Sequence, residues 1–154
     1  MKQLLENELL RSAQSGRPGV GLACPQIGIY KKMAIIRMGS ELEINLVNAT
    51  IKKGYDQFLH RDEGCLSFPD RTEDVLRFQE VYIVENLAGP ENMILTGLPA
   101  ICAQHELDHL NGVLLPDRAV KKPKVKAGPN QPCPCGKINP ETNQPVKFKK
   151  CCGK

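Results

Sequence analysis

Apolar residues recur at helical spacing in two parts of the chain. Four leucines between residues 2 and 14 follow a spacing close to i, i+3 and i+4, which predicts an amphipathic helix that ends before Gly16. A second helical pattern covers residues 94–112, with Pro99 acceptable in its first turn and Gly112 as its stop. Its shared face carries Leu98, Ile101, Cys102, His105 and His109.

Short runs rich in β-branched residues lie between these two helices. They cover residues 33–38, 44–51 and 81–87, and Gly, Asn and Asp separate them. Such spacing is typical of strands joined by hairpins. The sequence therefore predicts an α+β fold with mostly antiparallel sheets.

The apolar periodicity stops after Pro116, and the charge changes sign there. Residues 121–129 have the composition of a charged Pro/Gly linker, which divides a domain over 1–120 from a tail over 130–154. The first 120 residues hold 12 Lys and Arg against 16 Asp and Glu, a net charge of −4. The last 34 hold nine Lys against Glu141, a net charge of +8.

Length and composition restrict the class of protein. A chain of 154 residues that is 41% hydrophobic and 25% charged fits one globular domain with a small appendage. No run approaches the roughly 18 apolar residues of a membrane span, and the first residues lack the apolar core of a signal peptide. We expect a cytoplasmic protein whose seven cysteines serve metal binding, catalysis or packing rather than disulfides.

Residues 105–109 read His-Glu-Leu-Asp-His on the second predicted helix. Side chains four residues apart lie on one helix face, about 5–6 Å apart at Cβ. Both imidazoles can therefore bind one metal ion, with Glu106 beside it to take a proton from bound water, an arrangement suited to hydrolysis.

A catalytic site of this kind usually has a third protein ligand. No His follows His109, and Asp117 and Glu141 are the only later acids, whereas Cys65 lies upstream in Glu-Gly-Cys-Leu-Ser. A Cys-His-His set suits Fe²⁺ or Zn²⁺.

The glycine-rich segment 19–26 lacks both a P-loop ending and a dinucleotide fingerprint. It suits close approach to a peptide, with the Gln26 amide free to donate to a developing oxyanion.

Taken in order, Gly19–Gln26, Glu63–Ser67 and His105–His109 strongly resemble the three motifs of the peptide deformylases. The resemblance implies that family's antiparallel sheets around a central H-E-x-x-H helix, over about residues 1–120. It implies Cys65, His105 and His109 as ligands of Fe²⁺, with Zn²⁺ or Ni²⁺ as substitutes. The implied reaction is removal of the formyl group from N-formylmethionyl nascent peptides.

The resemblance also implies a role for each site residue. Glu106 is the general base, and Gln26 with the backbone N–H of Leu66 stabilises the oxyanion. Gly21 pairs with the substrate backbone, and the pocket for the methionine side chain is lined by Val20, Leu98, Ile101 and Cys102.

The chain also departs from the family pattern. Only 18 residues precede Gly19, fewer than usual, so the chain is either minimal or truncated. Cys24 replaces an alanine, which we expect to matter for packing. Glu63 is expected to orient a ligand from a buried position, whereas Asp108 could do so or be a solvated helix charge. Arg71 is the nearest candidate for a substrate-binding arginine.

Four cysteines of the tail form two close pairs: Cys133 with Cys135, and Cys151 with Cys152. They resemble the SEC-C zinc motif, although the 15 residues between Cys135 and Cys151 exceed its usual spacing, so a loop around 138–145 is inserted. The resemblance implies a closed Cys₄ site for structural Zn²⁺, a small zinc knuckle. The alternative is a disordered lysine tail.

Two other functions compete with the deformylase. A small metallopeptidase could use the same helix, and an inactive deformylase fold could serve as an adaptor on the ribosome. We expect an active, monomeric deformylase whose basic tail binds the ribosome or a chaperone.

Overall fold

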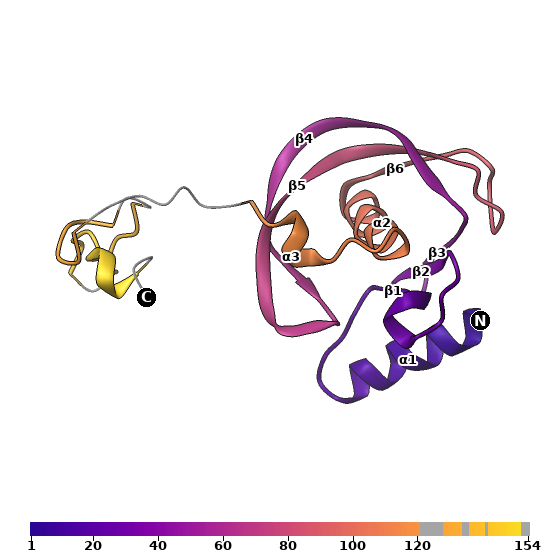
Figure 1. Cartoon of the computed structure of the whole chain (residues 1–154), viewed down its shortest axis with the longest axis horizontal. Coiled ribbons are helices and arrows are strands. Elements are labelled where there is room, and N and C mark those ends of the chain that lie inside the picture. Colours follow the sequence, from indigo (N-terminus) through magenta and orange to yellow (C-terminus); the bar gives the residue numbers. More distant parts are fainter. Residues whose placement is uncertain (121–127, 134–135, 141, 152–154) are drawn as a thin grey trace. The chain divides into compact units, whose positions relative to one another are not determined.

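A computed structural model describes residues 1–120, 128–133, 136–140 and 142–151. The chain forms two compact units, residues 1–120 and 121–154, which are described separately here (Figure 1). The first unit contains α1 (Lys2–Gln14), β1 (Gly21–Ala23), the 3₁₀ helix η1 (Cys24–Ile27), β2 (Met33–Met38), β3 (Leu42–Val47), β4 (Thr50–Cys65), β5 (Phe68–Val84), β6 (Met93–Thr96), α2 (Gly97–Leu110) and α3 (Leu115–Arg118).

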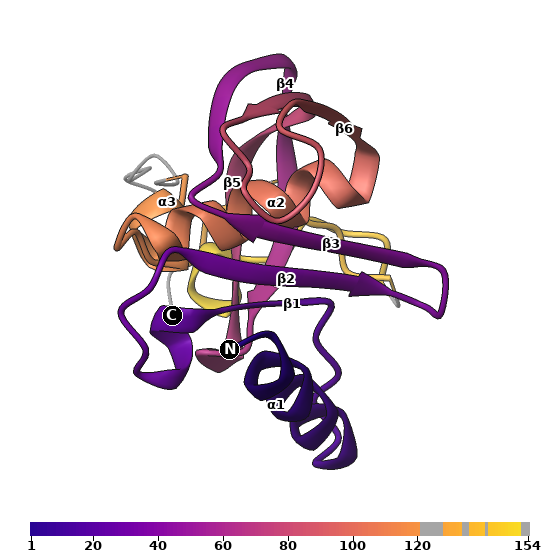
Figure 2. The ribbon, with the colours of Figure 1, turned by 90° about the vertical axis from the view of Figure 1, so that its right-hand side faces the viewer.

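Two antiparallel sheets form this unit. One has the strand order β1-β2-β3 and the other β4-β5-β6. Helix α2 packs against strands of both sheets, and α1 covers β1 and β2 on the far side of the first sheet (Figures 1 and 2). The predicted α+β architecture with a central helix is confirmed.

Helix α2 is buried on almost every side, because it lies between the sheets. Its apolar residues join those of β2, β3 and β5 in the main core, which includes Ala103, Leu107, Ile36, Leu46 and Ile83. Polar residues of α2 are therefore buried as well, and each must find a partner within the protein. A second cluster holds α1 on the first sheet through Leu5 and Leu9, and it contains Cys24, whose predicted packing role fits its full burial.

Three predicted boundaries are wrong. The run 44–51 is not one strand: β3 ends at Val47, and Asn48, with φ 57°, turns the chain into β4 at Thr50. The run 81–87 is only the end of β5, which stops at Val84 before Glu85 with φ 62°. Helix α2 begins at Gly97 rather than at 94, because the preceding residues pair with β5 as β6.

The long hairpin of β4 and β5 was not predicted, yet it positions much of the site. Its pairing register shifts once between Ile51 and Lys53 and then holds to His60. The pairing register then shifts between His60 and Glu63, where Asp62 has a φ of 54°. Such a bulge re-aims the next side chain, and Glu63 is buried as a result.

In the second unit, two segments of the tail pair with each other. Pro132 bridges Lys147, and the N–H of Cys133 donates to the Val146 carbonyl over 2.8 Å. Ile138 bridges Pro145, the two ends of the segment where an inserted loop is expected. The 3₁₀ helix η2 (Phe148–Lys150) leads to Cys151. Cys133 is buried and Cys151 half-buried, whereas Cys135 and Cys152 lie outside the described residues.

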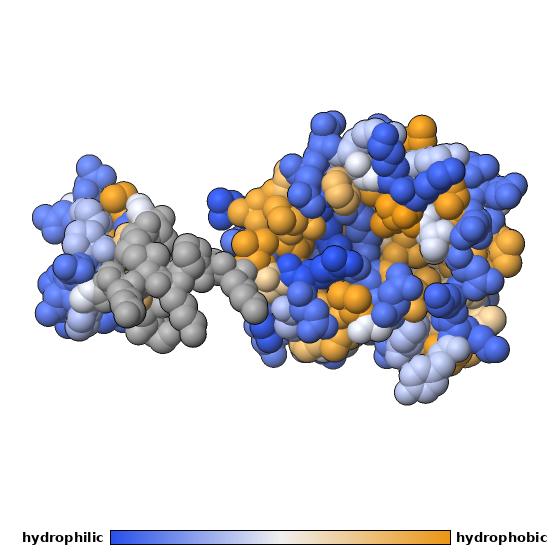
Figure 3. Space-filling view, turned by 45° about the horizontal axis from the view of Figure 1, so that its top comes forward, coloured by the Kyte–Doolittle hydropathy of each residue, from blue (hydrophilic) through white to orange (hydrophobic). Residues whose placement is uncertain are grey.

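On the face shown in Figure 3, hydrophilic residues of the first unit alternate with separate hydrophobic patches. Within the described residues, no helix is both long enough and apolar enough to cross a membrane.

Candidate metal centre

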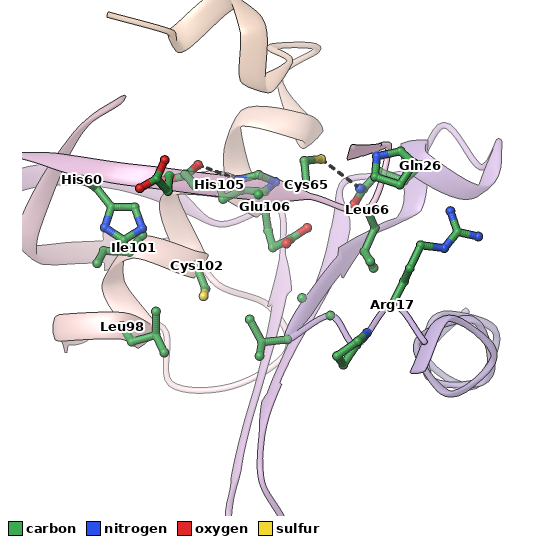
Figure 4. A pocket seen from close by; sticks show the side chains of 18 of the residues that line it. Arg17, Gln26, His60, Cys65, Leu66, Leu98, Ile101, Cys102, His105 and Glu106 are labelled. Carbon is green, nitrogen blue, oxygen red and sulfur yellow. Dashed lines mark hydrogen bonds and ion pairs between the residues drawn. The ribbon is translucent and has the colours of Figure 1, made fainter. Parts of the chain in front are cut away.

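The thiol of Cys65 and the imidazoles of His105 and His109 meet where the end of β4 faces α2. Figure 4 shows Cys65 and His105 of this group. The Nε2 atoms of the two histidines are 3.1 Å apart, and Cys65 Sγ lies 3.3 Å from His109 Nε2. With a metal–sulfur distance of about 2.3 Å and metal–nitrogen distances of about 2.1 Å, tetrahedral ligand atoms lie about 3.4–3.6 Å apart. The three side chains therefore suit one ion after small shifts.

The charge state of these groups also suits a cation. Burial opposes a thiolate at Cys65, but hydrogen bonds from His105, His109 and the Ser67 backbone outweigh it and lower the Cys65 pKa to about 5. A thiolate with two imidazoles is a donor set for Fe²⁺, Zn²⁺ or a similar divalent ion.

Glu63 fixes the ring of His105. Its Oε1 lies 2.7 Å from His105 Nδ1, which leaves Nε2 facing Cys65 and His109. Burial works against the Glu63 carboxylate, but hydrogen bonds from His105 and Arg77 outweigh it and lower its pKa to about 2. Glu63 thus has the buried orienting position expected of it, since a carboxylate on the far ring nitrogen fixes the tautomer of a ligating histidine.

Arg77 joins two buried carboxylates behind the metal centre. It donates two hydrogen bonds to Glu63, of 2.7 and 3.0 Å, and one of 2.7 Å to Asp108. Arg118 of α3 binds Asp108 from the other side through two hydrogen bonds. Asp108 is 8% exposed, so it is a buried ion-pair partner and not a solvated helix charge.

Glu106 lies beside the three candidate ligands but points into the pocket (Figure 4). It is 4% exposed, and its Oε2 has no hydrogen-bond partner among the described residues. A Cβ at Gly21 would collide with this carboxylate, so only glycine lets β1 approach so closely. Burial raises the Glu106 pKa to about 8, in the range where a group both takes and gives a proton near neutral pH.

The Gln26 side chain is held in a fixed orientation. Its Oε1 accepts from the Ala23 backbone N–H over 2.8 Å, so the amide nitrogen points the other way. Nε2 lies 3.1 Å from Ser67 Oγ and 3.9 Å from Cys65 Sγ (Figure 4). A donor is thereby presented next to the candidate ligands and next to the turn of Leu66 and Ser67.

A cavity of about 500 Å³ opens in front of these groups. The structure brings all the predicted pocket residues to its wall, namely Val20, Gly21, Leu98, Ile101 and Cys102, together with Gln26, Cys65, Leu66, His105 and Glu106. Burial raises the Cys102 pKa to about 12, so this side chain is a neutral thiol in an apolar wall. Arg71 does not line the cavity and pairs with Glu73 instead.

Two arginines of the centre were missed from the sequence. Arg77 lies mid-strand and Arg118 beyond the last motif, and neither has a local signature. A buried acid such as Asp108 in a helix requires a cation nearby, but the sequence does not say which of many basic residues supplies it.

Comparisons with known proteins agree with this geometry. Residues 1–125 match the family model described as polypeptide deformylase. A peptide deformylase of Microchaete diplosiphon is 38% identical over 124 residues, 77% of this chain and 65% of the relative. The chain spans 59–65% of the length of this and two further curated relatives.

Solved structures of deformylases share the fold. The peptide deformylase of Thermotoga maritima is 32% identical with a TM-score of 0.66, covering 78% of this chain and 81% of that one. A class I type b peptide deformylase of Acinetobacter baumannii with bound Met-Ala-Ser is 30% identical with a TM-score of 0.60, covering 75% and 79%. Motifs, fold and relatives agree, and the chain belongs to the peptide deformylase family.

Proposed function

We propose that this chain removes the formyl group from N-formylmethionyl peptides. The observation that carries the proposal is the convergence of Cys65, His105, Glu106 and Gln26 on one cavity, with His109 grouped with Cys65 and His105, in a chain of this family. The peptide Met-Ala-Ser, bound to the Acinetobacter baumannii relative, is the kind of product that such a reaction would leave.

Cys65, His105 and His109 would hold the metal, Fe²⁺ by family habit or Zn²⁺ or Ni²⁺ in its place. A bound divalent ion supplies Lewis acidity toward the formyl oxygen and toward water. Glu106 accepts the proton of the attacking water at Oε2, the oxygen that has no partner among the described residues. It then gives that proton to the departing amine nitrogen, so formate and a free amino terminus are the products.

Gln26 Nε2 and the Leu66 backbone N–H would donate to the oxygen that becomes negative. The Gln26 amide needs no reorientation for this task, because Ala23 already holds its oxygen. Donors fixed in advance stabilise a developing charge better than water does.

Strand β1 would bind the peptide backbone. It lies at the edge of its sheet, so its outer N–H and C=O groups are available to an added strand. Gly21 is part of this edge and lies against Glu106, which places the paired backbone next to the base. The methionine side chain would enter the pocket of Val20, Leu98, Ile101 and Cys102.

The products distinguish this activity from its rivals. Mass spectrometry of formyl-Met-Ala-Ser incubated with the metal-loaded full chain should show formate and Met-Ala-Ser. A metallopeptidase would give formyl-Met and Ala-Ser instead. An inactive adaptor would leave the tripeptide intact.

We propose a structural Zn²⁺ in the tail, held by Cys133, Cys135, Cys151 and Cys152. Support comes from the pairing of segments 131–133 and 146–148, which places Cys133 beside the segment that leads to Cys151. Few apolar residues are available to fold this unit without a metal. Cys133→Ser should lower the zinc content of the full chain by about one ion, whereas Cys24→Ala, which alters a buried cysteine of the first unit, should leave it unchanged. Equal zinc content of Cys133→Ser and wild type would refute the knuckle.

The lysines of the tail support a further proposal, that it binds the ribosome through RNA phosphate. Lys147, Lys149 and Lys150 are all exposed. Replacing these three lysines with Glu should weaken co-sedimentation with ribosomes. It should also reduce the magnitude of the slope of log affinity against log salt concentration by about two to three. Reversal of the exposed Lys31, Lys32 and Lys52 in the first unit serves as the control. Equal effects of the two triple variants would contradict a role for the tail.

A further inference from the structure

His60 places an imidazole on the cavity wall, where Leu98, Ile101 and Cys102 supply apolar surface and Asp62 and Glu63 of β4 supply carboxylates. It lies on β4 opposite the buried Val75, two residues after Phe58, so strand alternation turns all three toward the inside. The side chain lines the cavity near Ile101, with Leu98 and Cys102 below it (Figure 4).

The imidazole contacts the fold through the face and edge of its ring rather than through its nitrogens. Its ring packs edge-on against Phe58, with centroids 6.0 Å apart and an interplanar angle of 72°. Within the described part of the chain it has no hydrogen bond and no ion pair. An imidazole carries at least one N–H donor in every protonation state, so a donor is available to a molecule in the cavity.

The position of His60 relative to the centre indicates which part of a substrate it meets. Leu98, Ile101, Cys102 and His105 follow one face of α2, and four residues of a helix span about 6 Å. With the formyl group at His105 and the first side chain in the pocket proposed above, that side chain would run along this face, toward Ile101 and the ring above it (Figure 4). The outer end of that side chain, not the reacting carbonyl, comes nearest to His60.

Resting on the deformylase function proposed above, we infer that His60 is a specificity-determining residue that donates a hydrogen bond to the first side chain of the substrate. In methionine the acceptor is the thioether sulfur, which is weak. In methionine sulfoxide the acceptor is an oxygen, which is stronger, whereas a purely apolar pocket would reject this polar side chain. The pocket thus accepts formyl peptides whose first methionine has been oxidised.

Three formyl tripeptides test this inference, with norleucine, methionine or methionine sulfoxide before Ala-Ser. Norleucine has the shape of methionine without an acceptor. We compare the ratio of kcat/KM for the sulfoxide peptide to kcat/KM for the norleucine peptide. This ratio should be about 3- to 10-fold lower in His60→Phe than in wild type, the range of one net hydrogen bond. The ratio of kcat/KM for the methionine peptide to that for the norleucine peptide should fall less in the same variant. His60→Gln, which keeps an N–H donor, should restore part of the sulfoxide ratio.

The norleucine peptide separates the possible failures. Its turnover by wild type and by both variants shows that the pocket is intact, and unchanged sulfoxide ratios in His60→Phe would then overturn the inference. Absence of formate from all three peptides with the metal-loaded wild type would instead refute the deformylase function itself.

Discussion

Replacing Glu106 with Gln is expected to lower kcat/KM on formyl-Met-Ala-Ser by about 10²- to 10⁴-fold, the usual contribution of a positioned general base. Glutamine keeps the volume of the side chain but cannot take a proton at Oε2. Because Oε2 has no hydrogen-bond partner among the described residues, the substitution breaks no contact of that atom. The variant should therefore fold normally and bind as much metal as wild type.

The rates of formate release by wild type and by Glu106→Gln are compared on samples whose metal content has been measured. Glu91→Gln is the matched control, because its side chain is exposed and it does not line the cavity. It should retain full activity. A Glu106→Gln enzyme within tenfold of wild type would show that another group carries the proton.

Replacing Arg77 with Met is expected to lower the free energy of unfolding of the first unit by about 3–5 kcal/mol, the cost of breaking a buried ion pair by removing one partner. Arg77 is 3% exposed and lies between Glu63 and Asp108. Its loss leaves Glu63 without its guanidinium, with His105 as its remaining side-chain partner among the described residues. Metal affinity should therefore change together with stability.

Urea unfolding followed by circular dichroism measures the stability, and competition with a chelator measures the affinity. Arg71→Met on the same strand is the control, since Arg71 is 53% exposed and its one ion pair within the described residues is with Glu73. We expect a change within about 0.5 kcal/mol there. Equal free energies of unfolding of the two variants would contradict a stabilising role for the buried Arg77.

The sequence predicted the elements whose apolar pattern is strong. Residues 2–14 and 33–38 form the expected helix and strand, and α2 is the expected central helix. The middle of the β4–β5 hairpin escaped prediction because one face is exposed and carries polar residues such as Lys53 and Gln57. Alternation of this kind is weak when bulges interrupt it, as between His60 and Glu63.

The metal centre was predictable to the extent that its residues lie in short motifs. His105, Glu106 and His109 are fixed relative to one another by one helix, so their spacing carries the information. Arg77 contacts Asp108 across 31 positions of the sequence, and no local rule connects them. His60 reaches the cavity because the β4–β5 hairpin packs against α2 through β5, which a single sequence does not reveal.

Formate release from formyl-Met-Ala-Ser, followed while Ni²⁺ or Fe²⁺ is added stepwise to the metal-free full chain, tests metal-dependent deformylation at Cys65, His105 and His109 most directly. Activity should rise in proportion to the added metal and then level off. Cys65→Ser, which replaces the thiolate with a much poorer ligand, should give almost no formate at the same metal concentrations. A folded, metal-loaded wild type that releases no formate, or a Cys65→Ser variant as active as wild type, would contradict it.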